Sequence, residues 1–148
     1  MKHSGRLRIG VIGVGYVGRH HARLLSSSED VELVAVVDID QNQAKLVASE
    51  TGSGAELNVS RVMSEVDAVT VAVPTADHAS VAIPFLDAGI PVLVEKPIAA
   101  SLVEADRMIQ AARDRGTLLA VGHSERYNPA VCGRESGTHG PHDPPHLR

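Results

Sequence analysis

The sequence predicts an α/β fold with a doubly wound parallel sheet, and three observations support this prediction. Apolar, strand-like runs alternate with segments of helical periodicity, which is the pattern of repeated β-α-β units. The apolar residues are almost all aliphatic, with two Tyr, one Phe and no Trp among 148 residues, as expected for a parallel sheet buried under helices. A chain of this length can bury a substantial core in one domain. We expect that domain over residues 6–130.

The first β-α-β unit is the clearest part of the pattern. Apolar runs at 7–12 and 31–37 predict two strands, and the segment 19–25 between them predicts a helix. The first strand leads into a glycine-rich loop, Gly13-Val14-Gly15-Tyr16-Val17-Gly18, and the second ends at Asp38. The order is therefore strand, glycine loop, helix, strand, acid.

This order is typical of dinucleotide binding. Gly13 permits a tight turn, Gly15 permits close approach of a pyrophosphate, and Gly18 permits the helix to pack against the strand. The phosphates would lie at the helix N-terminus, where free N–H groups favour negative charge. Asp38 follows Gly18 by 20 residues, and its carboxylate can accept both ribose hydroxyls and repel a 2′-phosphate. The pattern favours NAD over NADP, and a flexible glycine turn is the alternative.

The next elements continue the alternation. We expect a helix over 41–50, with Asp40 as its N-cap and Gln43 completing a capping box. The segment 55–64 is ambiguous, and a short edge strand together with a helical turn is one interpretation of it. The run of β-branched residues at 67–73 predicts a strand that ends at a proline.

Four elements are expected after this proline, namely a helix over 76–88, a strand over 92–94, a helix between Ser101 and Gly116, and a strand over 117–121. Pro84 lacks an N–H donor, so we expect a kink or break in the first of these helices. Ser101 and Glu104 form a capping box for the second helix.

Right-handed crossovers bring the carboxyl ends of all the strands to one edge, where ligands bind in such folds. Lys96 follows the strand at 92–94, and there it can orient a substrate hydroxyl and stabilise a developing alkoxide. A surface ion pair with a neighbouring acid is an equally good interpretation. Pro97 leaves a cis peptide bond open, although most X–Pro bonds are trans.

Two further polar residues follow the last strand at the same edge. His123 can act as an acid or base near neutral pH, and Arg126 can bind a phosphate or carboxylate through two hydrogen bonds. For this segment alone, a polar loop leaving the domain is the plainer interpretation.

Composition argues against nucleic-acid binding, an internal disulfide and a membrane span. Fourteen basic and eighteen acidic side chains give a formal net charge of −4, without a basic run, so nucleic-acid binding has little support. The single Cys132 excludes an internal disulfide and fits a reducing compartment. The chain shows no signal-peptide segment and no apolar run long enough to span a membrane, so we expect a cytoplasmic protein.

Taken together, the motifs from about Leu7 to Pro129 resemble the N-terminal half of the Gfo/Idh/MocA family of NAD(P)-dependent sugar and polyol oxidoreductases. The resemblance rests on five motifs: Gly13-x-Gly15-x-x-Gly18 with His21-Ala22, Val37-Asp38, Val73-Pro74-Thr75 with His78, Glu95-Lys96-Pro97, and Gly122-His123-x-x-Arg126-Tyr127-x-Pro129. Within the family, the last motif is most similar to enzymes that oxidise UDP-N-acetylglucosamine at its 3-hydroxyl, or to related nucleotide-sugar dehydrogenases.

The resemblance implies a Rossmann fold, NAD as the cofactor, and contacts to it from three groups of residues. The pyrophosphate contacts would come from the glycine loop, namely Gly13, Gly15, Tyr16, Val17 and Gly18. Asp38 would bind the adenosine ribose. The remaining cofactor contacts would come from later loops, namely Val73, Pro74, Thr75, His78, Glu95 and Lys96.

The resemblance also implies hydride transfer to or from a sugar or UDP-sugar hydroxyl. Lys96 and His123 would be the catalytic residues, and Arg126 would join them in binding the substrate. His21, on the first helix, is expected to pack or cap locally. No metal site is expected, because the residues Cys132, His139, His142 and His146 match no standard zinc spacing.

Family members carry a second α/β domain, which supplies much of the substrate pocket and most of the dimer contacts. Here the resemblance ends near Val131, and we expect the second domain to be absent. The segment 131–148 has no periodicity and resembles a shifted reading frame or a mis-called gene end, so we expect it to be disordered. The resemblance implies a homo-oligomer for full-length members and gives less support for one in this chain. We expect little or no turnover from it, and the alternatives are a non-catalytic NAD-binding module and a truncated, non-functional product.

Overall fold

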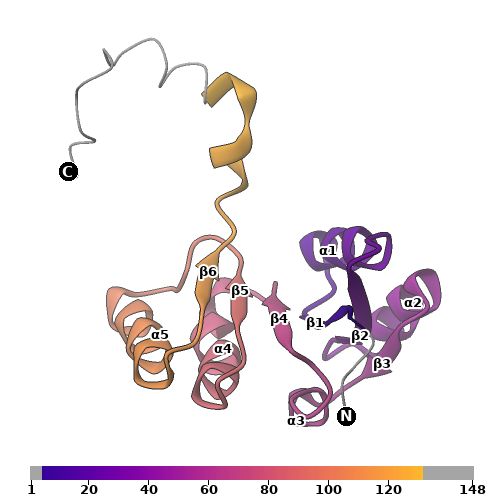
Figure 1. Ribbon diagram of the computed structural model, residues 1–148, viewed down its shortest axis with the longest axis horizontal. Coiled ribbons are helices and arrows are strands. Elements are labelled where there is room, and N and C mark those ends of the chain that lie inside the picture. Colours follow the sequence, from indigo (N-terminus) through magenta and orange to yellow (C-terminus); the bar gives the residue numbers. More distant parts are fainter. Residues whose placement is uncertain (1–4, 132–148) are drawn as a thin grey trace.

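The computed structural model describes residues 5–131, which form a six-stranded sheet with helices on both faces (Figure 1). The sheet order is β3-β2-β1-β4-β5-β6, and every neighbouring pair is parallel. The strands are β1 (Leu7–Ile12), β2 (Val31–Val37), β3 (Gly54–Glu56), β4 (Ala68–Val71), β5 (Val92–Val94) and β6 (Leu119–Val121). The order reverses between β1 and β4, which is the doubly wound topology and confirms the predicted fold class.

The helices divide between the two faces of the sheet. They are α1 (Tyr16–Ser26), α2 (Gln41–Thr51), α3 (Val59–Val62), α4 (His78–Asp87) and α5 (Leu102–Arg115), with short 3₁₀ turns η1 (Thr75–Asp77) and η2 (Ser124–Tyr127). Helices α1 and α2 cover one face, and α3, α4 and α5 cover the other (Figure 1). Within residues 5–131, no helix is long and apolar enough to cross a membrane.

Successive residues of β1 face opposite layers, which explains why the whole strand is apolar. Val11 packs with Ala22 and Val47 beneath α1 and α2, whereas Ile12 packs in the larger cluster beneath α4 and α5. Phe85 is fully buried in this larger cluster. The predicted aliphatic core is therefore present as two layers on either side of the sheet.

Two local predictions are resolved by the structure. The ambiguous segment 55–64 contains the end of β3 and the single helical turn α3. Of the predicted kink or break near Pro84, the break is wrong, because α4 continues past Pro84 to Asp87 and the carbonyl of Pro84 accepts a hydrogen bond from the Ala88 N–H. Burial of the neighbouring Phe85 and Leu86 offsets the lost hydrogen bond.

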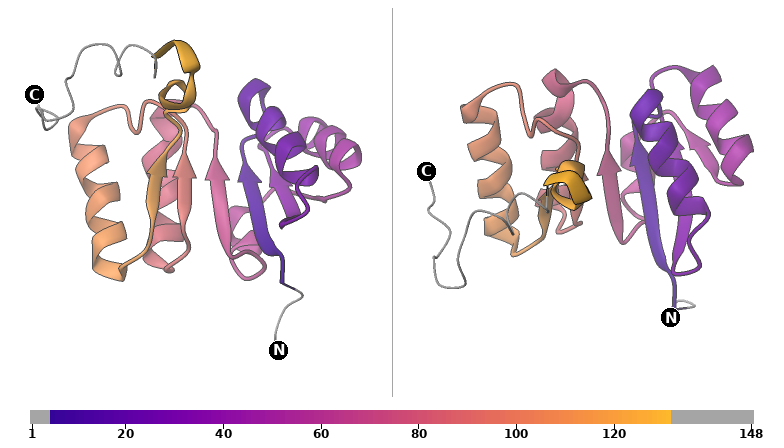
Figure 2. Two further views of the ribbon diagram at one scale, coloured as in Figure 1. Left: turned by 45° about the horizontal axis from the view of Figure 1, so that its top comes forward. Right: turned by 90° about the horizontal axis from the view of Figure 1, so that it is seen from above.

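The capping residues of α5 are as predicted. The Ser101 hydroxyl accepts the N–H of Glu104 at 3.3 Å, and Gly116 ends the helix in the left-handed conformation with φ of 60°. All strands point toward the same edge, which we call the carboxyl edge, and η2 lies beyond it (Figure 2). The tail residues Cys132, His139, His142 and His146, and all of 131–148 after Val131, lie outside the described residues.

Candidate functional site

The glycine loop lies at the carboxyl edge between β1 and α1, and two of its glycines are required by the protein itself. Gly13 has φ of 83°, and a Cβ there would lie 2.8 Å from the backbone of Ala72 and Val73. A Cβ on Gly18 would lie 1.8 Å from the carbonyl oxygen of Gly13. The loop therefore turns tightly against β4, and α1 packs directly on the loop.

Gly15 differs from these two glycines. It is the N-cap of α1 with φ of −64°, and a Cβ there would meet no protein atom within 4 Å. Neither backbone conformation nor packing in this chain requires glycine at this position. The bare backbone instead leaves open space at a helix N-terminus, and Tyr16 and Val17 beside it are 84% and 42% exposed. This geometry fits a pyrophosphate, which needs close approach to free N–H groups.

The backbone of Val14, inside the loop, is held from the β2–α2 side. Its N–H donates to Oδ2 of Asp38 at 2.9 Å, and its carbonyl accepts from Nε2 of Gln43 at 2.8 Å. Asp40 caps α2 as predicted, but the reciprocal half of the predicted capping box is wrong. The Gln43 amide binds the loop, and the Asp40 N–H donates to Oδ1 of Asp38 at 2.9 Å.

Asp38 lies at the end of β2 and is partly exposed. Each of its carboxylate oxygens accepts one backbone N–H, from Val14 and from Asp40. A carboxylate oxygen has two acceptor positions, so each oxygen can accept one more hydrogen bond. The two backbone contacts fix the orientation of the carboxylate, which leaves one free position per oxygen for a pair of neighbouring hydroxyls.

The loop after β4 contributes three of the predicted contacts to the carboxyl edge. Pro74 is exposed, and Val73 and Thr75 are partly exposed. His78 is 1% exposed, so its side chain is buried, and its predicted contact with the cofactor stays a prediction. Its Nε2 lies 3.0 Å from the carbonyl oxygen of Val73, and its Nδ1 lies 3.0 Å from that of Pro97. His78 thus joins the loop after β4 to the loop after β5 from beneath.

Glu95 and His21 form a contact that sequence reasoning missed. Nε2 of His21 lies 2.9 Å from Oε1 of Glu95, although His21 was expected to pack or cap locally on α1. The missed signal is its position three residues after the buried Gly18, since a polar residue beside the packed face of a helix needs a partner. The other Glu95 oxygen accepts the N–H of Lys96 at 3.1 Å, and the Lys96–Pro97 peptide bond is cis.

Lys96 and His123 lie in the loops after two neighbouring strands, β5 and β6, at the carboxyl edge, and both are exposed. They follow Val94 and Val121, which are paired in the sheet, by two residues each. Within the described part of the chain, the Lys96 ammonium forms no ion pair, so the alternative of an ion pair with a neighbouring acid is not realised there. Arg126 lies in η2 and is also exposed.

Behind the glycine loop, an ion-pair cluster joins α1 to α2. Nε of Arg19 donates to Oε2 of Glu50 at 2.9 Å, its Nη2 contacts Oε1 of Glu50, and Nη2 of Arg23 lies 3.4 Å from Oε2. The hydrogen bonds from Arg19 lower the pKa of the Glu50 carboxyl from its ordinary value of 4.5. The cluster holds the two helices that carry Gly18 and Gln43.

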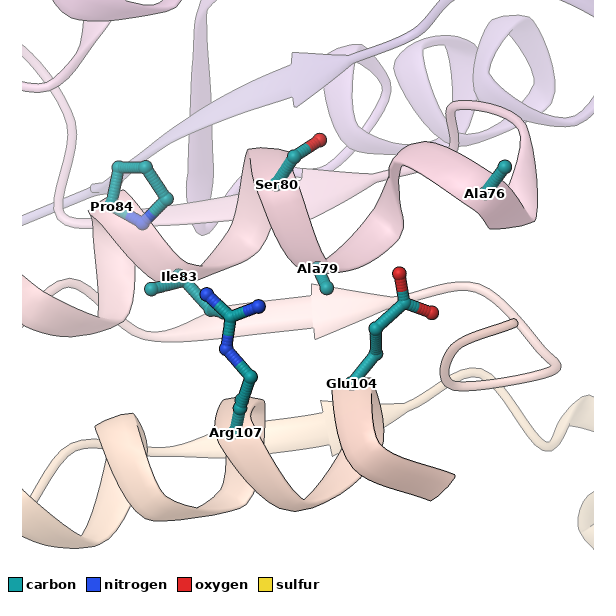
Figure 3. Close-up of a pocket in the computed structure, with 7 residues that line it drawn as sticks. All are labelled: Ala76, Ala79, Ser80, Ile83, Pro84, Glu104 and Arg107. Carbon is teal, nitrogen blue, oxygen red and sulfur yellow. The ribbon is translucent and has the colours of Figure 1, made fainter. Parts of the chain in front are cut away.

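A groove of about 240 Å³ lies between α4 and α5 (Figure 3). Its lining residues are Ala76, Ala79, Ser80, Ile83, Pro84, Glu104 and Arg107. None of them is a predicted site residue. Among residues 5–131, no group of three or more His, Cys, Asp or Glu side chains is arranged to hold a metal ion.

Known proteins share this fold and its sequence pattern. Residues 7–123 match the family described as an oxidoreductase family with an NAD-binding Rossmann fold. The chain is 39% identical over 125 residues to UDP-N-acetylglucosamine 3-dehydrogenase of Acidithiobacillus ferrooxidans, an alignment covering 84% of this chain and 39% of that protein. It is 35% identical over 130 residues to inositol 2-dehydrogenase 1 of Saccharopolyspora erythraea, covering 84% and 39%.

A solved structure gives the same result. GenD2 from gentamicin A biosynthesis, in complex with NAD, matches with a TM-score of 0.86 and 33% identity, covering 93% of this chain and 40% of that chain. The chain spans about two fifths of the length of these relatives. The family description also confirms NAD as the cofactor that the sequence predicts. On this evidence the chain belongs to the Gfo/Idh/MocA oxidoreductase family, with an NAD-binding Rossmann fold.

Proposed function

We propose that this chain binds NAD at its carboxyl edge and forms the cofactor-binding part of an oxidoreductase acting on a sugar or nucleotide-sugar hydroxyl. The observation that carries the proposal is the contrast among the loop glycines. Gly13 and Gly18 are needed by the fold, whereas Gly15 leaves open backbone at the N-terminus of α1. A ligand that approaches this backbone closely explains the third glycine.

The adenosine part of the cofactor would be recognised by Asp38. Its oriented carboxylate keeps one acceptor position on each oxygen, which suits the two hydroxyls of an unmodified ribose. A 2′-phosphate would bring two negative groups together at this position. The geometry therefore supports NAD over NADP.

The substrate would lie beside Lys96 and His123. Bound NAD would supply the acceptor for a hydride from the carbon that bears the reacting hydroxyl. The exposed Lys96 ammonium would orient that hydroxyl and stabilise negative charge on its oxygen. His123 would take the hydroxyl proton, since histidine is the side chain that most often serves as a general base.

A nucleotide sugar is the substrate class that we propose. The similarity of 122–129 to UDP-N-acetylglucosamine dehydrogenases supports this class, and a protein with that name is among the relatives. Arg126, exposed in η2, would bind a phosphate group of the substrate through two hydrogen bonds. Inositol dehydrogenases among the relatives make a simple polyol the competing class.

Cofactor binding is the part of this proposal that the purified chain can test directly. Isothermal titration with NAD and NADP should show binding of NAD and at least about tenfold weaker binding of NADP, because a like-charge contact costs several times RT. Thermal melting should show NAD raising the Tm, since a ligand that binds only the folded state stabilises it. A chain that melts cooperatively but binds neither nucleotide would refute the proposal.

A further inference from the structure

We propose that His21 is a positioning residue for the nicotinamide end of the site. It holds Glu95, and through Glu95 it fixes the backbone that presents Lys96. This inference rests on the proposed function, because it needs a cofactor whose nicotinamide lies beside Glu95 and Lys96. The proposed role lies outside α1, the helix that carries His21, because the contact of His21 is with Glu95 after β5.

The His21–Glu95 contact connects the two halves of the sheet. His21 lies on α1, which packs over β1 and β2, whereas Glu95 directly follows β5. In the sheet, β4 lies between β1 and β5, so the contact crosses the point where the strand order reverses. The side chains of His21 and Glu95 are 22% and 17% exposed, so their 2.9 Å contact is partly shielded from water. Shielding strengthens such a contact relative to one on the open surface.

Glu95 is also held by contacts other than the one to His21. Its Oε2 accepts the N–H of Lys96 at 3.1 Å, and its backbone N–H donates to the carbonyl of Val71 at 2.9 Å. A Cβ on Gly122 would lie 3.0 Å from Oε1 of Glu95, so glycine at that position makes room for the carboxylate. Glu95 therefore has one defined place, and His21 is the side chain that binds it there.

His78 holds the same turn from the opposite side. Its Nδ1 lies 3.0 Å from the carbonyl oxygen of Pro97 and 3.3 Å from that of Ile98. The turn is thus fixed at Glu95 by α1 and after Pro97 by α4. Between these two points, Lys96 is exposed, and its ammonium has no ion-pair partner among the described residues. The arrangement fixes the Lys96 backbone and leaves its ammonium available.

Two ligands separate a positioning role from a general structural one. ADP-ribose contains the adenosine, pyrophosphate and second ribose of NAD but lacks nicotinamide. Loss of positioning at Glu95 and Lys96 should weaken NAD binding and leave ADP-ribose binding unchanged. General damage to the fold should weaken the binding of both ligands.

The experiment compares the full chain with three variants by isothermal titration. His21→Leu should weaken NAD binding about tenfold, because a hydrogen bond to a charged group is lost. Its affinity for ADP-ribose should stay within about twofold of the unchanged chain. His21→Gln, whose amide can still donate to Glu95, should restore most of the NAD affinity. Leu24→Ala, at a 74% exposed position on α1, is the matched control and should change neither affinity.

Emission from bound NADH provides a second measurement, because its fluorescence comes from the reduced nicotinamide. We expect His21→Leu to change the emission intensity and Leu24→Ala to leave it unchanged. Equal losses of NAD and ADP-ribose affinity, or no loss in either, would overturn the role of His21. Should His21→Leu fail to fold, His21→Ala, which also lacks the contact to Glu95, supplies the same comparison, with His21→Gln as the variant that keeps the contact. Failure of the unchanged chain to bind either ligand would instead overturn the proposed function, and this inference with it.

Discussion

The glycine-loop end of the carboxyl edge (Gly13–Gly18 with Asp38) and its lysine end (Glu95–Pro97 with His123) are built in different ways. At the glycine-loop end, backbone groups are bound by side chains of the same chain, as Val14 is bound by Asp38 and Gln43. At the lysine end, the backbone is fixed equally well, but Lys96 and His123 themselves are exposed. The glycine-loop end is therefore held by contacts within the chain, whereas the lysine end leaves the side chains of Lys96 and His123 exposed to solvent.

This difference suits the glycine-loop end to binding the dinucleotide and the lysine end to reacting with a substrate. A rigid backbone with open N–H groups can bind a dinucleotide without any movement, since little conformational entropy remains to be lost. A Lys or His held by internal partners would be less available to a substrate, and neither side chain forms an ion pair within the described residues. We therefore expect changes at the glycine-loop end to alter folding and the binding of the whole dinucleotide, and truncation of Lys96 or His123 to spare both folding and ADP-ribose binding.

The largest effect is expected at Gly18. A methyl group there would lie 1.8 Å from the carbonyl of Gly13, so Gly18→Ala must displace α1 from the loop. We expect a loss of about 3 kcal/mol in the free energy of unfolding, at the upper end for overpacked sites. Urea unfolding measures this loss. Gly15→Ala is the matched control, because its methyl group meets no protein atom; it should keep the stability and lose NAD affinity.

Asp38→Ala should have the next largest effect, on binding rather than on folding. It removes the acceptors for the ribose and one of the two contacts that hold Val14. We expect NAD binding to weaken by about 1.5–3 kcal/mol, the value of hydrogen bonds to a charged group. Isothermal titration of Gln43→Ala isolates the loop contribution, because that variant loses only the contact to the Val14 carbonyl. Equal losses in the two variants would mean that Asp38 acts on the loop alone.

The same two ends show what the sequence can predict. Gly13, Gly18 and Asp38 are found because local backbone geometry and regular spacing demand them. The contacts of His21 with Glu95 and of Gln43 with Val14 could not be predicted, because they join residues far apart in the chain and depend on helix packing. Pro84 shows the opposite error, where a local rule predicted a break that burial of neighbouring side chains overrides.

A smaller, pH-dependent effect is expected behind the glycine loop. Because Arg19 lowers the pKa of Glu50 below 4.5, Glu50 stabilises the fold above that pH and loses this contribution as the pH falls through its folded-state pKa. Glu50→Gln should therefore lower the Tm at pH 7, and the difference from the unchanged chain should shrink toward pH 3. Added salt should also reduce it, because the pair is accessible to solvent. A Tm difference that is constant across this pH range would contradict the ion-pair role.

Lys96→Ala should have the smallest effect on the chain by itself, and this makes it the sharpest test of the contrast between the two ends. Lys96 is exposed and its ammonium forms no ion pair within residues 5–131, so truncation should change the free energy of unfolding by less than about 0.5 kcal/mol. Its affinity for ADP-ribose should also be unchanged. Urea unfolding and titration measure the two quantities. A clear loss of stability would mean that the Lys96 side chain stabilises the fold. The lysine end would then be held by internal contacts in the same way as the glycine loop, and the Lys96 ammonium would not be available to a substrate.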